Sequence, residues 1–141
     1  MNDKANILIV DDEEVVRISH LRSLEGVECN ARAAEGGNQA IDVMEQQPFD
    51  VVLLDLRMPD LDGMDLLKTI KQRWPDSEVV VITGYPSIET AKEAVRLGAC
   101  NYLTKPLGPN EVLKAANDAI NQKRWSLRST EEPQTDKLTV Q

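Results

Sequence analysis

Cysteine and histidine are scarce in this sequence, which has two cysteines, Cys29 and Cys100, and one histidine, His20, among its 141 residues. Two cysteines cannot form the disulfide framework that supports small secreted domains. Neither cysteine has a second cysteine or a histidine at the spacing of a metal site. We therefore expect all three to be ordinary packing residues, with His20 half-buried on the apolar face of a helix.

Long apolar runs are missing as well. No run approaches the roughly 20 residues that cross a bilayer as a helix. The first residues, MNDKANILIV, include charged Asp3 and Lys4 and reach Asp11 after a few apolar positions, so they lack the uncharged core of a signal peptide. We predict a cytoplasmic protein without a membrane partner.

Basic residues are outnumbered, with 16 Lys and Arg against 24 Asp and Glu and a net charge of −8. Because such a chain is repelled by phosphate backbones, we expect no direct binding of nucleic acid by this domain. The length suits a single packed core rather than two domains. We predict one domain over residues 1–123 and a polar tail or linker over residues 124–141, where helical periodicity is lost.

Five short apolar runs alternate with five amphipathic segments. The runs predict strands at 7–10, 27–31, 51–54, 79–82 and 100–103, and three of them are unbroken Val, Ile and Leu, as in strands buried on both faces. Helical spacing lies between them, at 15–24, 40–44, 64–74, 88–95 and 112–120, with Val15, Ile18, Ile88 and Val95 among the apolar positions. This order predicts an α/β fold, a doubly wound parallel sheet with helices on both faces.

Polar side chains follow four of these runs. In a doubly wound sheet, ligands bind beyond the carboxyl ends of the strands, where the strand order reverses. The residues at those ends are Asp11 and Asp12 after the first run, Asp55 after the third, Thr83 after the fourth and Lys105 after the fifth. We expect them to meet at one rim of the sheet.

Three carboxylates at one rim repel each other unless a cation lies among them, and oxygen ligands favour Mg²⁺, with Mn²⁺ as a substitute. Beside such a cation Asp55 can act as a nucleophile and form an aspartyl phosphate. The Lys105 ammonium suits one phosphoryl oxygen and the Thr83 hydroxyl another.

Each residue also has a simpler interpretation when taken alone. Asp11 and Asp12 suit the dipole of the following helix, and Asp55 suits an Asx turn. Thr83 can simply end a strand, and Lys105 can be a solvated surface lysine. The chemically complete set at one rim favours the functional interpretation.

Three stretches resemble, in order and spacing, the motifs of the receiver domain of two-component response regulators, over residues 5 to 123: ILIVDDEE, VVLLDLRMPDLDGMDLL and VVVITGYPSIETAKEAVRLGACNYLTKP. The resemblance implies a flavodoxin-like sheet of order 2-1-3-4-5, as in chemotaxis receivers. With that order Cys29 and Cys100 lie at opposite edges, roughly 19 Å apart, and cannot pair.

The resemblance also implies roles for the acidic residues and their neighbours. Asp55 is the expected phosphoacceptor and a metal ligand, Asp12 a direct Mg²⁺ ligand and Asp11 a ligand through water. The backbone carbonyl of Arg57 is expected to be a further ligand of the metal.

A second group of residues matches the switching machinery of the family. Thr83 and Tyr102 match the switch pair, in which the hydroxyl turns toward the phosphoryl group as the ring moves inward. Lys105 matches the family's lysine, and the Lys105-Pro106 bond is a candidate for the cis form.

The family further implies a sensor histidine kinase as phosphoryl donor. The surface of the fourth helix, fifth strand and fifth helix is expected to control homodimerisation or an output partner. TGYPSIETAKEAV is most similar to receivers attached to enhancer-binding transcription activators. We expect a self-phosphorylating switch rather than a turnover enzyme.

Two other functions stay open. Phosphatases of the haloacid dehalogenase kind also use an aspartyl nucleophile and Mg²⁺, but they place D-x-D after the first strand and carry a cap domain. Here Asp11-Asp12-Glu13 follows the first strand, and the length leaves no room for a cap. A pure interaction module with a vestigial site is the other alternative.

Overall fold

The computed structural model describes residues 4–131, and it describes residues 125–131 by their backbone alone. These residues form one parallel sheet of order β2-β1-β3-β4-β5, which confirms the predicted fold. The strands are β1 (Ala5–Val10), β2 (Cys29–Ala34), β3 (Val51–Asp55), β4 (Glu78–Thr83) and β5 (Asn101–Thr104). Cys29 begins one edge strand and Cys100 directly precedes the other, so the two cysteines lie at opposite edges, as expected.

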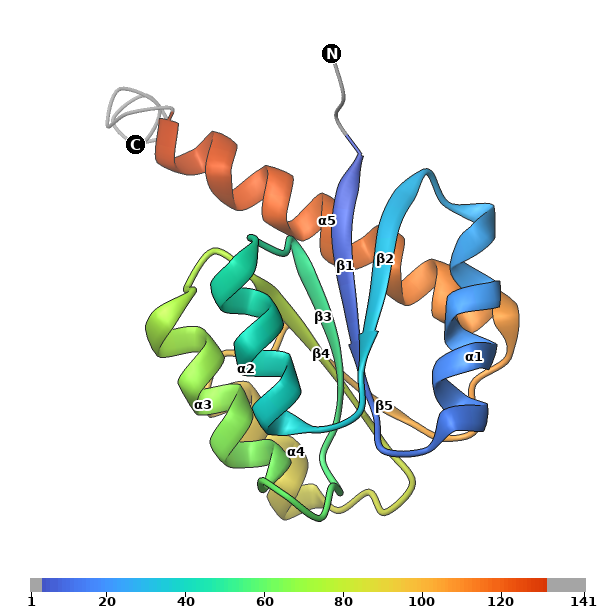
Figure 1. Cartoon of the computed structure of the whole chain (residues 1–141). Coiled ribbons are helices and arrows are strands. Elements are labelled where there is room, and N and C mark those ends of the chain that lie inside the picture. The colour runs from blue at the N-terminus through green and yellow to red at the C-terminus, as the bar shows by residue number, and fades with distance from the viewer. Residues whose placement is uncertain (1–3, 132–141) are drawn as a thin grey trace.

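Helices cover both faces of the sheet (Figure 1). They are α1 (Glu14–Ser23), α2 (Gly37–Gln46), α3 (Gly63–Arg73), α4 (Ile88–Arg96) and α5 (Pro109–Glu131), with a short 3₁₀ turn, η1 (Leu24–Gly26), after α1. α2, α3 and α4 lie on one face, and α1 and α5 on the other. Each helix of the described residues is too short or too polar to cross a membrane.

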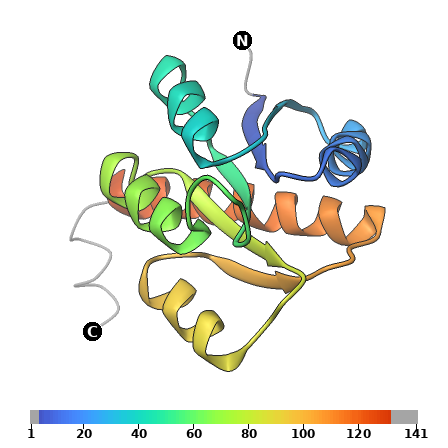
Figure 2. The ribbon, with the colours of Figure 1, turned by 60° about the horizontal axis from the view of Figure 1, so that its bottom comes forward.

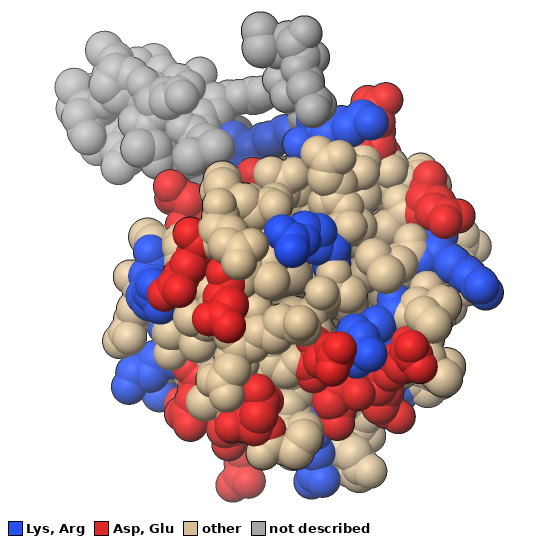
Figure 3. Space-filling view, in the orientation of Figure 1, with Lys and Arg blue, Asp and Glu red and all other residues tan. Residues whose placement is uncertain are grey.

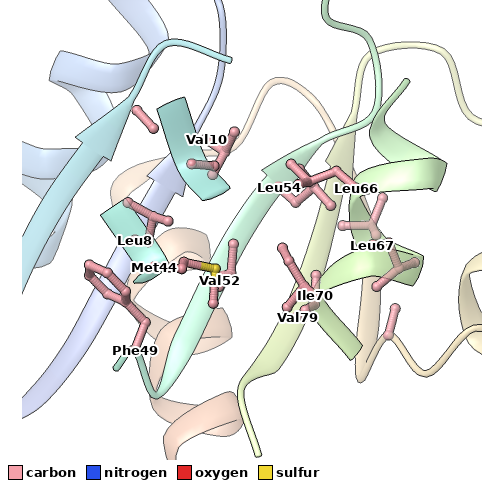
Figure 4. Packing of buried hydrophobic residues seen from close by; sticks show 14 of the residues in the cluster. Leu8, Val10, Met44, Phe49, Val52, Leu54, Leu66, Leu67, Ile70 and Val79 are labelled. Atoms are coloured by element: carbon pink, nitrogen blue, oxygen red, sulfur yellow. The ribbon is translucent and has the colours of Figure 1, made fainter. Parts of the chain in front are cut away.

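The central strands contribute side chains to two apolar cores, because successive side chains of a strand point to opposite faces of the sheet. Leu8, Val52 and Val79 pack with α2 and α3 on one side, where Figure 4 shows Met44 and Ile70 against them. The neighbouring residues Ile7, Val51 and Val80 pack against α5 on the other side. Burial on both faces holds β1, β3 and β4 in place, and with them the residues at their carboxyl ends.

Four predicted apolar positions lie at the surface instead. Val15 and Ile18 of α1 and Ile88 and Val95 of α4 are exposed. α4 buries only the small side chain of Ala94 and contacts the short edge strand β5 and α3, so its larger apolar residues have no neighbour to cover them. The periodicity of the first helix correctly places His20 on the core side, but in both helices the predicted apolar positions extend beyond the side that faces the core.

His20 is buried, with 5% of its surface exposed, rather than half-buried as predicted. It is the one buried residue of α1, whereas Val15 and Ile18, which were expected to lie on the same apolar face, are exposed. Of the two cysteines, Cys29 is half-buried, and Cys100 is more exposed than a packing residue should be, although burial raises the pKa of its thiol to about 11.

α5 continues past the predicted domain end at Lys123 and runs to Glu131. The sequence contains neither Gly nor Pro between Pro109 and Pro133, so no residue there interrupts a helix even where the apolar spacing stops. Lys123 fixes α5 to the sheet through an ion pair of 2.7 Å with Asp50. Residues 132–141 of the predicted tail lie outside the described residues.

Candidate functional site

The predicted site residues meet at one rim of the sheet, which faces the viewer in Figure 2. Asp55 is the last residue of β3 and Thr83 the last of β4, while Asp11 and Lys105 follow β1 and β5 directly. Since all the strands are parallel, their carboxyl ends lie on the same side of the sheet. The expectation that four strand ends converge is confirmed.

Three carboxylates form the centre of the rim. One oxygen each of Asp11, Asp12 and Asp55 lies within 4.8 Å of the others. Asp11 and Asp55 are buried, with 2% and 4% of their surface exposed, and Asp12 is exposed. The set contains oxygen atoms alone and is open on the side of Asp12, which suits a hard divalent cation that keeps some of its water.

Lys105 lies between the carboxylates. Its Nζ is 2.8 Å from Asp11 Oδ2, 3.3 Å from Asp55 Oδ2 and 3.6 Å from Glu13 Oε1. Burial alone would lower the pKa of Lys105, but the hydrogen bonds and charges of Asp11 and Asp55 raise it above its usual value. Lys105 is therefore a positive charge held within reach of any group attached to Asp55. The bond between Lys105 and Pro106 is cis, as predicted.

The pKa of Asp55 is raised above its usual value. Burial is the main cause, and the negative charge of Asp11 adds to it. The backbone N–H of Arg57, which donates to Asp55 Oδ1 at 3.2 Å, and the ammonium of Lys105 act in the opposite direction. The negative charge of Asp55, buried beside Asp11, is thus only partly compensated by the Arg57 N–H and the Lys105 ammonium.

The predicted switch residues Thr83 and Tyr102 do not contact each other through a hydrogen bond. Thr83 is buried, and its hydroxyl accepts a hydrogen bond of 3.0 Å from the backbone N–H of Tyr85. The Tyr102 hydroxyl lies 2.6 Å from Thr90 Oγ1 and accepts from the backbone N–H of Ser87 at 3.2 Å. It is therefore attached to the first turn of α4, a contact that the sequence pattern did not indicate.

Two further side chains border the rim. The guanidinium of Arg57 stacks on the ring of Tyr85, 3.9 Å from its centroid. The open pocket beside them is lined by Asp12, Glu13, Asp55, Arg57, Gly84, Tyr85 and Lys105. Glu13 was not among the predicted site residues, although its place directly after Asp11-Asp12 was a signal for it.

Charges of both signs are mixed on the face of the molecule shown in Figure 3. Acidic side chains gather in several patches there, with basic side chains beside them. This distribution agrees with the net charge of −8.

A family model described as the response regulator receiver domain matches residues 7–117 of the chain. The transcriptional regulatory protein ZraR of Escherichia coli strain K12 is 43% identical over 110 residues, which are 75% of this chain and 24% of that protein. The response regulator protein PilR of Pseudomonas aeruginosa is 40% identical over 100 residues, 71% of this chain and 22% of that protein. The chain thus spans about a quarter of the length of these curated relatives.

Solved structures agree with this result. NtrX from Brucella abortus superposes with a TM-score of 0.85 at 30% identity, covering 91% of this chain and 29% of that chain. A CheY-like response regulator receiver domain protein from Methanospirillum hungatei JF-1 gives a TM-score of 0.84 at 26% identity, over 88% of this chain and 99% of that chain.

Proposed function

Because the chain belongs to the receiver domain family of two-component response regulators, we propose that it is a switch in which Asp55 accepts a phosphoryl group from a sensor histidine kinase. One observation carries the proposal: the carboxylates of Asp11, Asp12 and Asp55 converge within 4.8 Å, and the Lys105 ammonium lies 3.3 Å from Asp55. That set supplies an acceptor, a cation site and a fixed positive charge.

Asp11, Asp12 and Asp55 are the proposed side-chain ligands of Mg²⁺ or Mn²⁺. The backbone carbonyl of Arg57 is the proposed additional ligand, since the Arg57 N–H already holds this residue against Asp55. The cation, when bound, offsets the repulsion between the Asp55 carboxylate and the negative oxygens of an incoming phosphoryl group.

In the proposed transfer, an Asp55 carboxylate oxygen attacks the phosphorus of a phosphohistidine on the kinase. The new O–P bond forms as the N–P bond breaks, and the imidazole leaves with the electron pair of that bond. The Lys105 ammonium is placed to neutralise one oxygen of the transferred group. Thr83 keeps its hydroxyl proton free to donate to another, because in the structure this oxygen acts as an acceptor toward Tyr85.

The transferred group biases an equilibrium between two arrangements of α4, β5 and α5. Rotation of Thr83 toward the phosphoryl group and inward movement of the Tyr102 ring require the Tyr102 hydroxyl to leave Ser87 and Thr90. The exposed Ile88 and Val95 of α4 then offer apolar surface for homodimerisation or for an output partner.

The output belongs to the proposal as well. ZraR and PilR are a transcriptional regulatory protein and a response regulator, and the chain matches about a quarter of each. We propose that this domain regulates an output of that class without touching nucleic acid or membrane itself. We also propose a cytoplasmic location, a switch without catalytic turnover of its own, and a receiver unit within residues 1–123.

The direct test is labelling with acetyl phosphate, or with a phosphorylated kinase, in the presence of Mg²⁺. Wild type should be labelled, Asp55→Asn should not, and Asp65→Asn, an exposed residue of α3, should be labelled like wild type. Full labelling of Asp55→Asn would refute the assignment. Sustained Mg²⁺-dependent hydrolysis of phosphate esters would favour the phosphatase alternative, and failure to bind Mg²⁺ would favour a vestigial module.

A further inference from the structure

α2 begins without a capping side chain of its own, because its N-cap residue is Gly36. The cap comes from a loop distant in the sequence. Asp60 Oδ1 accepts a hydrogen bond of 3.2 Å from the backbone N–H of Gly37, and Asp60 Oδ2 accepts one of 3.1 Å from that of Asn38. Asp60 thus satisfies two of the N–H groups that a helix leaves unpaired at its start, and its charge lies at the positive end of the helix dipole.

The two glycines make this approach possible. A Cβ built on Gly36 would lie 2.7 Å from Asp60 Oδ1, and one built on Gly37 would lie 2.6 Å from Leu61 Cδ2. A larger residue at Gly36 would displace the Asp60 carboxylate from its place at the start of α2, and one at Gly37 would displace the side chain of Leu61. The Gly36-Gly37 pair thus leaves room for Asp60 and Leu61 of another segment.

That segment is the β3–α3 loop, residues 56–62, which leads from Asp55 to α3. At its start the N–H of Arg57 donates to Asp55, and at its end the N–H of Gly63 donates to the carbonyl of Leu56 at 3.1 Å. Between these points the loop is held by the apolar side chains of Met58 and Leu61 and by Asp60. Asp62 Oδ1 accepts a hydrogen bond of 2.8 Å from the backbone N–H of Met64, which ties the loop to the start of its own helix, α3. The Asp60 hydrogen bonds instead join the loop to a separate helix, α2, and so restrict where the loop lies.

We propose that Asp60 is a positioning residue for the cation site: by capping α2 it fixes the β3–α3 loop so that the Arg57 carbonyl faces the carboxylates. The proposal rests on the proposed function, because it concerns the same site. Its physical basis is preorganisation, since a ligand that is already in place loses less conformational freedom when the cation binds.

Three variants separate this role from loss of charge. Asp60→Ala removes both the cap and the charge. Asp60→Asn removes the charge but keeps one acceptor oxygen, and Asn caps helices as well as Asp does. Gly36→Ala keeps the charge but places a methyl group where the carboxylate lies. Gly108→Ala is the matched glycine control, because a Cβ there meets its nearest neighbour at an ordinary 3.6 Å.

The measurements are Mg²⁺ affinity by calorimetry on the full chain, at a temperature where every variant is folded by circular dichroism, and amide exchange of residues 57–61 without divalent cation. Asp60→Ala and Gly36→Ala should both weaken Mg²⁺ binding about tenfold, as loss of an outer contact of a metal site does. Both should also accelerate exchange in the loop. Asp60→Asn should lie within about threefold of wild type because it keeps half of the cap, and Gly108→Ala should match wild type.

Two results would overturn the inference. Equal Mg²⁺ affinity in wild type, Asp60→Ala and Gly36→Ala would mean that Asp60 merely stabilises α2. Weak binding by both Asp60 variants, with normal binding by Gly36→Ala, would mean that only its charge matters. If wild type itself bound no Mg²⁺, the proposed function would fail, whereas normal binding by every variant would remove the inference alone.

Discussion

The loop after β3 and the loop after β4 both lead from the rim into a helix, yet they are attached to the molecule by different contacts. In the first, Gly63 lies so close to Leu56 that an added Cβ would be 2.4 Å from the Leu56 Cα, and Asp60 bonds to the backbone of α2. In the second, a Cβ on Gly84 would have its nearest neighbour at 3.9 Å. α4 is held there through the hydroxyl of Tyr102.

The difference separates two tasks within one rim. The close packing of Gly63 on Leu56 and the hydrogen bonds of Asp60 to α2 hold the acceptor, Asp55, and its neighbours in one geometry. A hydroxyl that can exchange one partner for another holds the part proposed to move. A site must be rigid to bind a cation and a phosphoryl group, and its readout must have two states of similar energy.

The largest effect should come from adding one methyl group at Gly63, where the first loop enters α3, and the same change at Gly84 in the second loop is its comparison. Gly63→Ala forces a Cβ against the backbone of Leu56 and Asp55, which cannot move aside as a flexible side chain would. We expect a loss of about 2 to 3 kcal/mol in the free energy of unfolding, as for overpacking in a core. Gly84→Ala should change it by less than about 0.5 kcal/mol. Urea denaturation of the two variants measures these changes in the free energy of unfolding. Equal losses in both would mean that the two loops do not differ in how tightly they are packed.

A smaller effect, of opposite sign, is expected at the acceptor. The pKa of Asp55 is raised in the folded protein, so ionisation of Asp55 opposes folding. Asp55→Asn should therefore raise the free energy of unfolding at pH 7 without divalent cation, by about 1 kcal/mol. The gain should vanish below the usual carboxyl pKa of 3.8, where the group is protonated in both states, and reach its full size above the raised pKa.

Urea denaturation of wild type and Asp55→Asn between pH 3.5 and 7.5 provides the measurement. A gain that stays constant over this range would show that the ionisation of Asp55 is not its source. A lower stability of Asp55→Asn at pH 7 would mean that the attraction to Lys105 outweighs burial and the repulsion from Asp11.

The smallest effect on stability is expected from Tyr102→Phe. The change removes the hydroxyl that bonds to Ser87 and Thr90 but keeps the ring. Since both hydrogen bonds are partly or fully exposed to water, we expect a loss of about 0.5 to 1 kcal/mol for the two together. The larger consequence is local, because amide exchange should accelerate in α4 and stay unchanged in α3. Mass spectrometry of peptides from the two helices measures this exchange. Equal protection of α4 in wild type and in Tyr102→Phe would mean that the Tyr102 hydroxyl does not hold α4 in place.

The fold and the acceptor set could be predicted from the sequence because both follow from simple patterns. Unbroken runs such as Ile7 to Val10 and Val51 to Leu54 are long enough to identify strands buried on both faces. Each run then ends at a polar residue, and parallel strands bring those ends together. The acidic cluster is thus a direct result of the strand order.

What the sequence did not reveal are contacts whose partners are distant and whose residues are individually common. An aspartate that caps another segment's helix, as Asp60 does, carries no local pattern, because its partners are backbone N–H groups. The outward faces of α1 and α4 were also missed. Periodicity shows which residues share a side, but only the neighbouring elements decide whether that side is covered, as the exposed Val15 and Val95 show.

The ion pair between Lys123 and Asp50 ties the late part of α5 to the amino edge of the sheet, away from Asp55. α5 starts beside the rim and spans 23 residues, so it is about 35 Å long and its two ends lie at opposite poles of the domain. A molecule bound at the far end of α5 would therefore not collide with a phosphoryl donor bound at Asp55.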